Sequence, residues 1–375
     1  MRVKVLTPPD ETLLSSMLYE GYLRIVSECG EEATEECVSK AVQQLLEEKE
    51  VYFGFAGNDL KYTLNKISKE FNVDQSEFSG LKFLLKLKVQ DLAVAVRLVK
   101  LSSGKDAVLV GTSGFDGTAG YTFQIMKVDR YKGISSPESK VFWKDVTTYA
   151  DLSGVFLFFT GLASSYVTRV REVGEGESYY FLFFDTETLL NRVIGGNLRN
   201  WIAVKDELLK RIKERIERYG GINDEAITLT VLFNTYLLEE LERSQVRYVG
   251  FRLVRVNREG QTYKVYVDMP LRVYHGRRIY ESIGEDREAV ERINRIVDTL
   301  VEPAARFVRG RDDVGDGYHA FKALRYLFMY ITTENPLYVG MMHRELHEAY
   351  RARKSRGKPG AERYLACFLK PTIGY

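Results

Sequence analysis

Hydrophobic residues in the first half of the chain follow helical and strand-like patterns in turn. Apolar side chains recur at helical spacing over residues 11–28, and a second helix with an acidic first turn is predicted over 32–48. Strands are predicted where apolar residues alternate or form short runs, at 2–6, 94–99, 107–110, 121–127, 155–160, 166–173 and 178–185. Residues 50–72 fit a strand or a helix. Mostly antiparallel pairing is expected, because the Gly-Glu-Gly-Glu run at 174–177 is typical of a hairpin turn.

The second half of the chain is predominantly helical. An apolar stripe predicts a helix that begins near residue 198 and ends at Gly220. Further helices are predicted at 224–243 and 285–308, and a hairpin at 247–256 and 262–267. The stretch from Phe321 to Ile331 is apolar nearly all round, which predicts a helix buried on most sides. The expected fold is therefore α+β, with a mixed α/β domain over 1–284 and a C-terminal bundle of three or four helices over 285–375.

Composition and charge suggest where a partner would bind. The chain has 375 residues, of which 45% are hydrophobic, enough to bury one large core or two modest ones. The charged share of 28% leans towards a thermophile. Residues 201–375 contain 31 Lys and Arg against 25 Asp and Glu, whereas residues 1–200 contain 23 against 27. An anionic partner is therefore expected on the second half.

The cysteines and the apolar runs bear on the cellular compartment. Cys29, Cys37 and Cys367 form no CxxC pair, so neither a cysteine zinc site nor a disulfide framework is expected. The sequence begins with the strand-like MRVKVL, and its longest apolar runs are too short to span a bilayer. We therefore expect a reduced, cytoplasmic protein with no membrane partner.

His343 and His347 form the sharpest single motif. The His-Arg-Glu-Leu-His run places two imidazoles at i and i+4 on one helix face, where they can share a metal ion. It differs from the HExxH signature, because its Glu is at the third position. Spacing marks out no third ligand, although His319 and nearby Glu residues are options. The alternative is a helix face whose histidines meet carbonyls, carboxylates or nucleic acid, and no cofactor is expected.

Two regions are candidates for contact with nucleic acid. Glycines recur at every third position from Gly111 to Gly120, in a pattern that is neither a Walker A loop nor a dinucleotide fingerprint. This segment is either a long hairpin loop or a loop whose backbone N–H groups approach phosphates. The second region is the basic run from residue 351 to 358, which contains no acidic residue. The candidate residues are Lys100, Lys105, Gly111, Thr112, Gly114, Gly117, Lys210, Arg211, Arg351, Arg353, Lys354, Arg356 and Lys358.

Catalytic signatures are absent from the sequence. It contains no Walker A loop, no His-Asp doublet of a metal nuclease, and no Gly-x-Ser-x-Gly elbow. An enzyme is therefore not expected. Lys210 and Arg211 lie on a helix face of alternating charge, which is usually a salt-bridged solvent face, but they could add phosphate contacts.

Several stretches resemble a known family. MRVKVLTPPDETLLSSMLYEGY, VFLFFTGLASSY, YYFLFFDTE and KALRYLFMYITTENPLYVGMMHRELHEAYRARK together resemble the large subunit of archaeal type I-A CRISPR interference complexes (Cascade). This resemblance implies a non-catalytic subunit for antiviral defence. Its N-terminal domain would inspect the protospacer-adjacent motif in duplex DNA, and its C-terminal helices would support the displaced or target strand.

The resemblance also implies partners. They are the backbone and small subunits of the complex, guide RNA contacted indirectly, target double-stranded DNA, and a helicase-nuclease effector. Two other functions stay open from the residues alone. One is a metal-dependent hydrolase or phosphodiesterase that uses His343 and His347, and the other is a purely structural assembly subunit.

Overall fold

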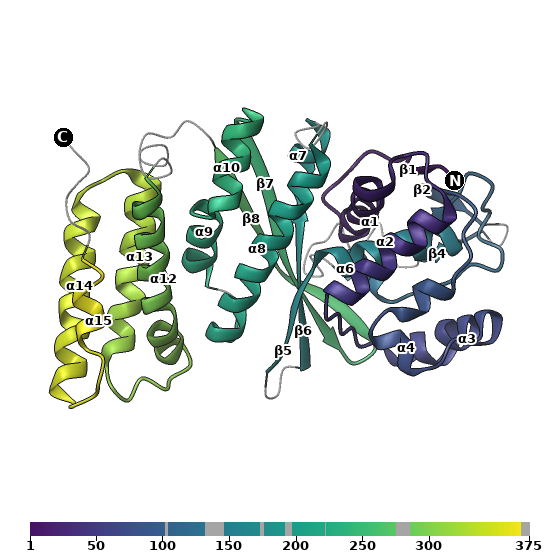
Figure 1. Cartoon of the computed structure of the whole chain (residues 1–375). Coiled ribbons are helices and arrows are strands. Elements are labelled where there is room, and N and C mark those ends of the chain that lie inside the picture. Colours follow the sequence, from purple (N-terminus) through teal and green to yellow (C-terminus); the bar gives the residue numbers. More distant parts are fainter. Residues whose placement is uncertain are drawn as a thin grey trace. The chain divides into compact units, whose positions relative to one another are not determined.

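The chain folds into the mixture of sheets and helices that its sequence predicts (Figure 1). This computed structural model describes residues 1–101, 104–131, 146–172, 176–191, 197–221, 223–274 and 286–368. The α+β class is confirmed, with sheets and helices in the N-terminal part and helices at the C-terminus. The chain forms two compact units. The first comprises residues 1–203 and 249–270, and the second comprises residues 204–248 and 271–375.

The described residues form two four-stranded sheets. The first has the order β1 (Val3–Val5), β2 (Leu92–Lys100), β3 (Asp106–Gly111) and β4 (Thr147–Ala150). In it β2 and β3 are antiparallel, whereas β1 pairs with β2 and β3 with β4 in parallel. The second has the order β5 (Tyr166–Glu172), β6 (Gly176–Phe184), β7 (Tyr248–Glu259) and β8 (Thr262–Tyr274). Its β5–β6 and β6–β7 pairings are antiparallel, as expected.

Three longer helices accompany the sheets of the first unit. They are α1 (Leu13–Cys29), α2 (Glu35–Glu48) and α6 (Leu152–Ser165). The shorter helices are η1 (Asp59–Leu64), α3 (Asn65–Phe71), α4 (Ser76–Ser79), η2 (Lys82–Lys86), η3 (Ile125–Tyr131) and α7 (Thr186–Leu190). Helices α1 and α6 pack closely because glycines meet at their crossing. A Cβ atom on Gly161 would lie 1.7 Å from the carbonyl oxygen of Met17.

Two strand predictions in this unit were wrong. The predicted strand at 155–160 lies within α6, whose residues from Ser153 to Ser165 are all buried. A helix that is apolar on every face has no helical period in its sequence, so a short run of this kind cannot be distinguished from a buried strand. The predicted strand at 121–127 is a single bridge from Tyr121 to Ala150, followed by η3.

No disulfide framework was expected among the cysteines, and here too the structure differs from the prediction. Cys29 ends α1 and Cys37 lies in the first turn of α2, and the two form a disulfide with their Cα atoms 5.9 Å apart. The tight turn between the helices brings together two residues whose spacing matches no standard motif. Cys367 is free and buried.

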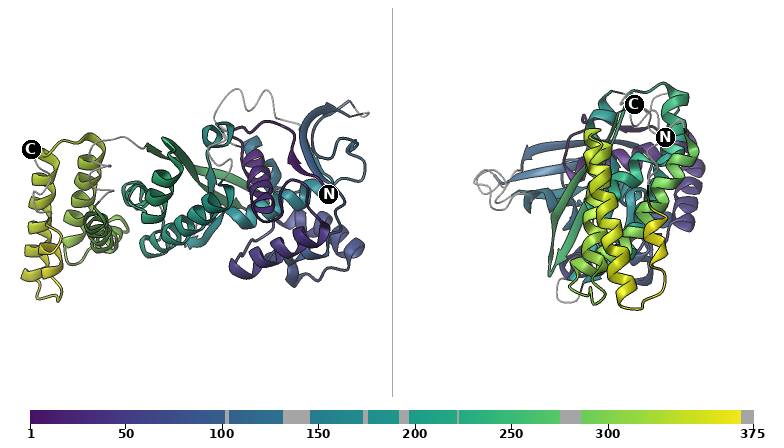
Figure 2. Two further views of the ribbon diagram at one scale, coloured as in Figure 1. Left: turned by 45° about the horizontal axis from the view of Figure 1, so that its top comes forward. Right: turned by 90° about the vertical axis from the view of Figure 1, so that its left-hand side faces the viewer.

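Helices dominate the second unit. Its main helices are most of α8 (Leu198–Tyr219), α9 (Asp224–Leu232), α10 (Thr235–Ser244), α12 (Arg287–Val308), α13 (Asp316–Thr333), α14 (Leu337–Ser355) and the short α15 (Glu362–Leu365). Helix α13 packs against both α12 and α14, and the views agree that these helices lie side by side (Figure 2). The helix predicted over 224–243 is divided in two, because the Asn234 side chain caps a new start by accepting from Leu237 N.

One apolar core serves the second unit. It combines residues of α12, α13 and α14 with Ala226, Leu229 and Phe233 of the α9 region. The helices that sequence patterns assign to 285–375 thus share their core with a segment that was placed in the N-terminal domain. Among the described residues, no helix is long and apolar enough to cross a membrane.

Candidate nucleic-acid interface

Helices α13 and α14 form a pair joined by a short break. Helix α13 ends where Glu334 adopts a left-handed conformation, and the Asn335 side chain then accepts a hydrogen bond from Leu337 N at the start of α14. The Thr-Glu-Asn-Pro segment therefore ends one helix and starts the next. Residues 316–358 contain eight Lys and Arg and four Asp and Glu, so this hairpin is basic overall.

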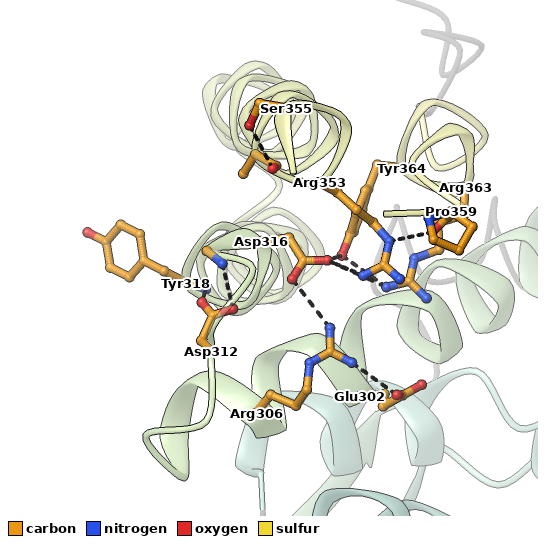
Figure 3. A network of polar contacts seen from close by, with 12 residues as sticks. Glu302, Arg306, Asp312, Asp316, Tyr318, Arg353, Ser355, Pro359, Arg363 and Tyr364 are labelled. Carbon is orange, nitrogen blue, oxygen red and sulfur yellow. Dashed lines mark hydrogen bonds and ion pairs between the residues drawn. The ribbon is translucent and has the colours of Figure 1, made fainter. Parts of the chain in front are cut away.

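Asp316 anchors the bundle (Figure 3). Its side chain is fully buried, and its Oδ2 accepts hydrogen bonds from Arg353 Nη1 at 2.8 Å and from the Tyr364 hydroxyl at 2.7 Å. Its Oδ1 accepts from Arg306 Nη2 at 3.3 Å, and Arg363 Nη2 lies 3.7 Å from Oδ2. Burial by itself would raise the pKa of Asp316, but these hydrogen bonds and guanidinium charges hold the pKa below its usual value.

Through this network Arg353 has a structural role. Its guanidinium joins α14 to the first turn of α13, and its Nε also donates to the Pro359 carbonyl at 2.7 Å. The side chain is 15% exposed. Of the five cations between residues 351 and 358, Arg353 is therefore the one held inside the bundle.

The other four cations in this run are exposed. Arg351 pairs with Glu348 at 3.5 Å, and Lys354 Nζ donates to the Tyr350 hydroxyl at 2.7 Å. The side chains of Arg356 and Lys358 form no ion pair with the described residues. The end of α14 therefore keeps a net positive charge, which suits the sequence-independent phosphate contact expected for it.

A second buried carboxylate organises the middle of the hairpin. Glu345 is 2% exposed and lies within ion-pair distance of His319 Nδ1 (2.7 Å), Lys322 Nζ (3.1 Å) and Arg344 Nη2 (3.1 Å). Burial alone would raise the pKa of Glu345, but hydrogen bonds from His319, Lys322 and Arg344 lower it to about 2. One buried anion thus fixes three basic side chains on the surface.

Tyrosines flank these basic side chains. Tyr318 is 44% exposed, and Lys322 Nζ lies 5.1 Å from its ring centroid. Tyr326 of α13 stacks on Tyr338 of α14 with the ring centroids 6.3 Å apart. Helical spacing along α13 places residues 318, 322 and 326 on one face. We call this surface the α13–α14 basic strip and define it as Tyr318, His319, Lys322, Tyr326, Tyr338 and Arg344.

The histidine motif that first suggests a metal site is arranged differently. The His343 ring packs 4.7 Å from that of Phe368, and His347 lies 6.3 Å from the ring of Tyr350. Burial lowers the pKa of His343. Within the part of the chain that the structure describes, no three His, Cys, Asp or Glu side chains are grouped as metal ligands. The Glu of this motif, Glu345, instead orients basic side chains.

The glycine-rich segment is held firmly at its start. Thr112 donates to Asp151 Oδ2 through its backbone N at 2.8 Å and through its hydroxyl at 2.9 Å. Arg97 donates to the carbonyls of Thr112, Ser113 and Phe115 at 2.7–2.9 Å. A Cβ atom on Gly111 would lie 2.4 Å from the Asp151 carboxylate, so only glycine fits there.

The two lysines assigned to this region lie at the other end of the β2–β3 pair. Lys100 is paired with Asp106 in register, and both Lys100 and Lys105 are exposed. The loop folds back towards them, since a Cβ atom on Gly117 would lie 3.6 Å from the Leu101 side chain. Gly117 has a φ of +92°, and a Cβ atom on Gly114 would meet no neighbour. The structure thus brings Gly117 near Leu101, the neighbour of Lys100, and leaves Gly114 accessible.

Lys210 and Arg211 lie on α8. Lys210 Nζ is 4.0 Å from Glu207, and Arg211 is 3.3 Å from Glu207 and 3.9 Å from Glu214. These exposed pairs one turn apart match the salt-bridged solvent face that alternating charge predicts. His275, which sequence analysis does not assign to a site, lies outside the described residues.

Sequence reasoning did not assign Lys322, Arg344 and Glu345 to a site. A usable signal existed, because Glu345 occupies a position of α14 that helical spacing directs to the core, beside Met342 and Leu346. A carboxylate at an apolar position must be paired. Its partners on α13 could not be identified from α14 alone.

Comparisons with known proteins add one relative of unknown function. An uncharacterized protein of Archaeoglobus fulgidus is 26% identical to this chain over 394 residues, which cover 97% of this chain and 98% of that protein. No protein-family model and no solved structure matches the chain.

Proposed function

We propose that this protein is the non-catalytic large subunit of a Cascade-type CRISPR interference complex, and that it binds target DNA. The observation that carries the proposal is the α13–α14 basic strip, where one buried carboxylate fixes three basic side chains beside exposed tyrosine. The resemblance of the chain to type I-A large subunits supports the assignment to this kind of complex.

The chemistry of the strip suits a single DNA strand. Ammonium and guanidinium groups neutralise phosphates, and aromatic rings stack on bases regardless of their identity. Fixed cations lose less side-chain entropy on binding than free ones do. The displaced or target strand is therefore the expected ligand of the strip, and the exposed cations at the end of α14 would extend its path.

The β2–β3 end and the glycine-rich segment are the proposed contact with the protospacer-adjacent motif. Lys100 and Lys105 supply charge, and Gly114 and Gly117 allow close approach of a backbone. Arg97 and Asp151 hold the start of the segment in one conformation. Guide RNA, the backbone and small subunits, and a helicase-nuclease are the proposed partners, in the cytoplasm.

Charge removal in the strip tests this proposal. The double variant Lys322→Gln, Arg344→Gln and the control Lys210→Gln, Arg211→Gln each remove two basic charges, the control pair from the salt-bridged face of α8. Binding of the full chain to a fluorescent single-stranded oligonucleotide is measured across a KCl series. Losing two phosphate contacts should flatten the slope of log K against log salt by about 1.4. The control should keep the wild-type slope.

Two results would count against the proposal. One is a strip variant with the wild-type slope and affinity while its circular dichroism spectrum is unchanged. The other is failure of the full chain and of its reconstituted complex to bind DNA, which would instead favour a purely structural subunit.

A further inference from the structure

The Cys29–Cys37 disulfide closes a small ring of nine residues between two helices. Both cysteines are partly exposed, so a reductant can reach them. Between them, only Ala33 is buried. Cys29 packs against the core, but the segment that the disulfide closes is a surface turn, so loss of the disulfide need not unfold the unit.

The turn inside this ring holds the N-terminus of the chain. The Met1 ammonium donates to the Ala33 carbonyl at 2.9 Å, and Ala33 N donates to the Met1 carbonyl at 3.0 Å. Val3 N donates to the Glu31 carbonyl at 2.9 Å. Because β1 pairs with β2 on its other side, the turn covers the outer edge of the first sheet.

Acidic side chains crowd the same turn, although Glu28 pairs with Arg199 at 3.3 Å and Glu31 accepts a hydrogen bond from the Tyr22 hydroxyl at 2.9 Å. Glu28, Glu31, Glu32, Glu35 and Glu36 are all exposed and lie within nine residues of one another. Like charges this close repel, most strongly at low ionic strength. Thr34 caps the start of α2, where its hydroxyl accepts a hydrogen bond from Cys37 N at 3.2 Å. The disulfide therefore cross-links a turn that carries several like charges.

A cavity adjoins the cross-linked turn. It measures about 340 Å³, and one wall consists of Met1 with Glu35, Val38 and Ser39 from the first turns of α2. Residues 84–89 and Phe156 form much of the remainder. The cavity wall that contains Met1 therefore lies next to the turn that the disulfide cross-links.

We propose that Cys29–Cys37 is a redox latch, and that its reduction releases the N-terminal residues and the start of α2 while the core of the first unit stays folded. A dithiol reductant supplies the two electrons. Its thiolate attacks one cysteine sulfur, the other cysteine leaves as a thiolate and takes up a proton, and the second thiol of the reductant displaces the first cysteine. The products are two cysteine thiols and an oxidised, cyclic reductant.

Intact-mass analysis after alkylation tests the chemistry. Iodoacetamide should add no group to the native oxidised protein and two groups after dithiothreitol treatment. It should add three groups after dithiothreitol treatment in denaturant, because Cys367 is buried in the native protein. Two adducts without reductant would show that the disulfide does not form, and would overturn the proposal.

Hydrogen exchange followed by mass spectrometry tests the release. On reduction, amides in residues 1–5 and 30–42 should exchange at least tenfold faster at low salt, with a smaller effect at high salt, whereas α6 should be unchanged. The variant Cys29→Ser, Cys37→Ser should resemble the reduced protein and be insensitive to dithiothreitol. Unchanged exchange in residues 1–5 and 30–42 of the reduced wild type, or equal acceleration in α6, would overturn the latch. The wild-type comparison stands even if the variant does not fold.

Discussion

At the scale of single residues, two buried carboxylates link the helices of the second unit. Asp316 joins the ends of α12, α14 and α15 to the start of α13, and Glu345 joins α13 to α14. Both are surrounded by basic groups, which keeps them ionised although they are buried. Asp316 thereby stabilises the fold, while Glu345 also orients the basic side chains of the α13–α14 basic strip.

Replacing Asp316 should therefore destabilise the second unit. Asp316→Asn leaves the Arg353 guanidinium and its neighbours without a counter-charge. Breaking a buried ion pair in this way lowers the free energy of unfolding by about 3–5 kcal/mol. Urea unfolding of the full chain, followed by circular dichroism, measures the loss. Asp313→Asn, at an exposed position just before α13, is the control and should change stability by less than about 0.5 kcal/mol. Equal stability of the two variants would show that Asp316 does not stabilise the second unit.

At the scale of elements, amphipathic patterns predicted helices well. Helices α8 and α12 each have one apolar face, and the predicted positions of α1, α8 and α12 agree with the structure. Helix α6 was missed because it is buried all round, so its sequence carries no contrast between faces. The same limit applies to the 351–358 run. Its charge was evident, but the pairing of Arg353 with Asp316, 37 residues away, depends on how α13 and α14 pack.

The crossing of α1 and α6 gives a sharp test at this scale. Gly161→Ala places a methyl group against the Met17 carbonyl and forces the helices apart, so it should destabilise the protein by about 1–3 kcal/mol. Gly340→Ala makes the same change in α14, where a Cβ atom meets nothing within 4 Å. It should stabilise the protein by up to about 1 kcal/mol, because alanine favours helices. In thermal unfolding, Gly161→Ala should lower the melting temperature and Gly340→Ala should raise it. An unchanged melting temperature for Gly161→Ala would contradict the close packing of α1 and α6.

At the scale of the whole molecule, the chain leaves the first unit and returns to it before forming the bundle. The sequence predicted a single domain boundary near residue 285, because hydrophobic patterns show only where one type of secondary structure gives way to another along the chain. A core that α9 shares with α12 and α13 is a contact across some 60 residues and leaves no local signature. The basic strip could be predicted only in part for the same reason. A carboxylate at an apolar position of α14 indicates that a partner exists, but its partners on α13 depend on how the two helices pack.

The central claim is that this strip binds a DNA strand. The most direct measurement places the photo-crosslinker p-benzoylphenylalanine at Tyr318 in the full chain and irradiates it with a labelled single-stranded oligonucleotide. Tyr236, on α10 and 56% exposed against 44% for Tyr318, is the matched control position. Crosslinking at position 318 should exceed that at position 236 at least fivefold and should disappear in high salt. Equal crosslinking at the two positions, or crosslinking that persists in high salt, would contradict the account.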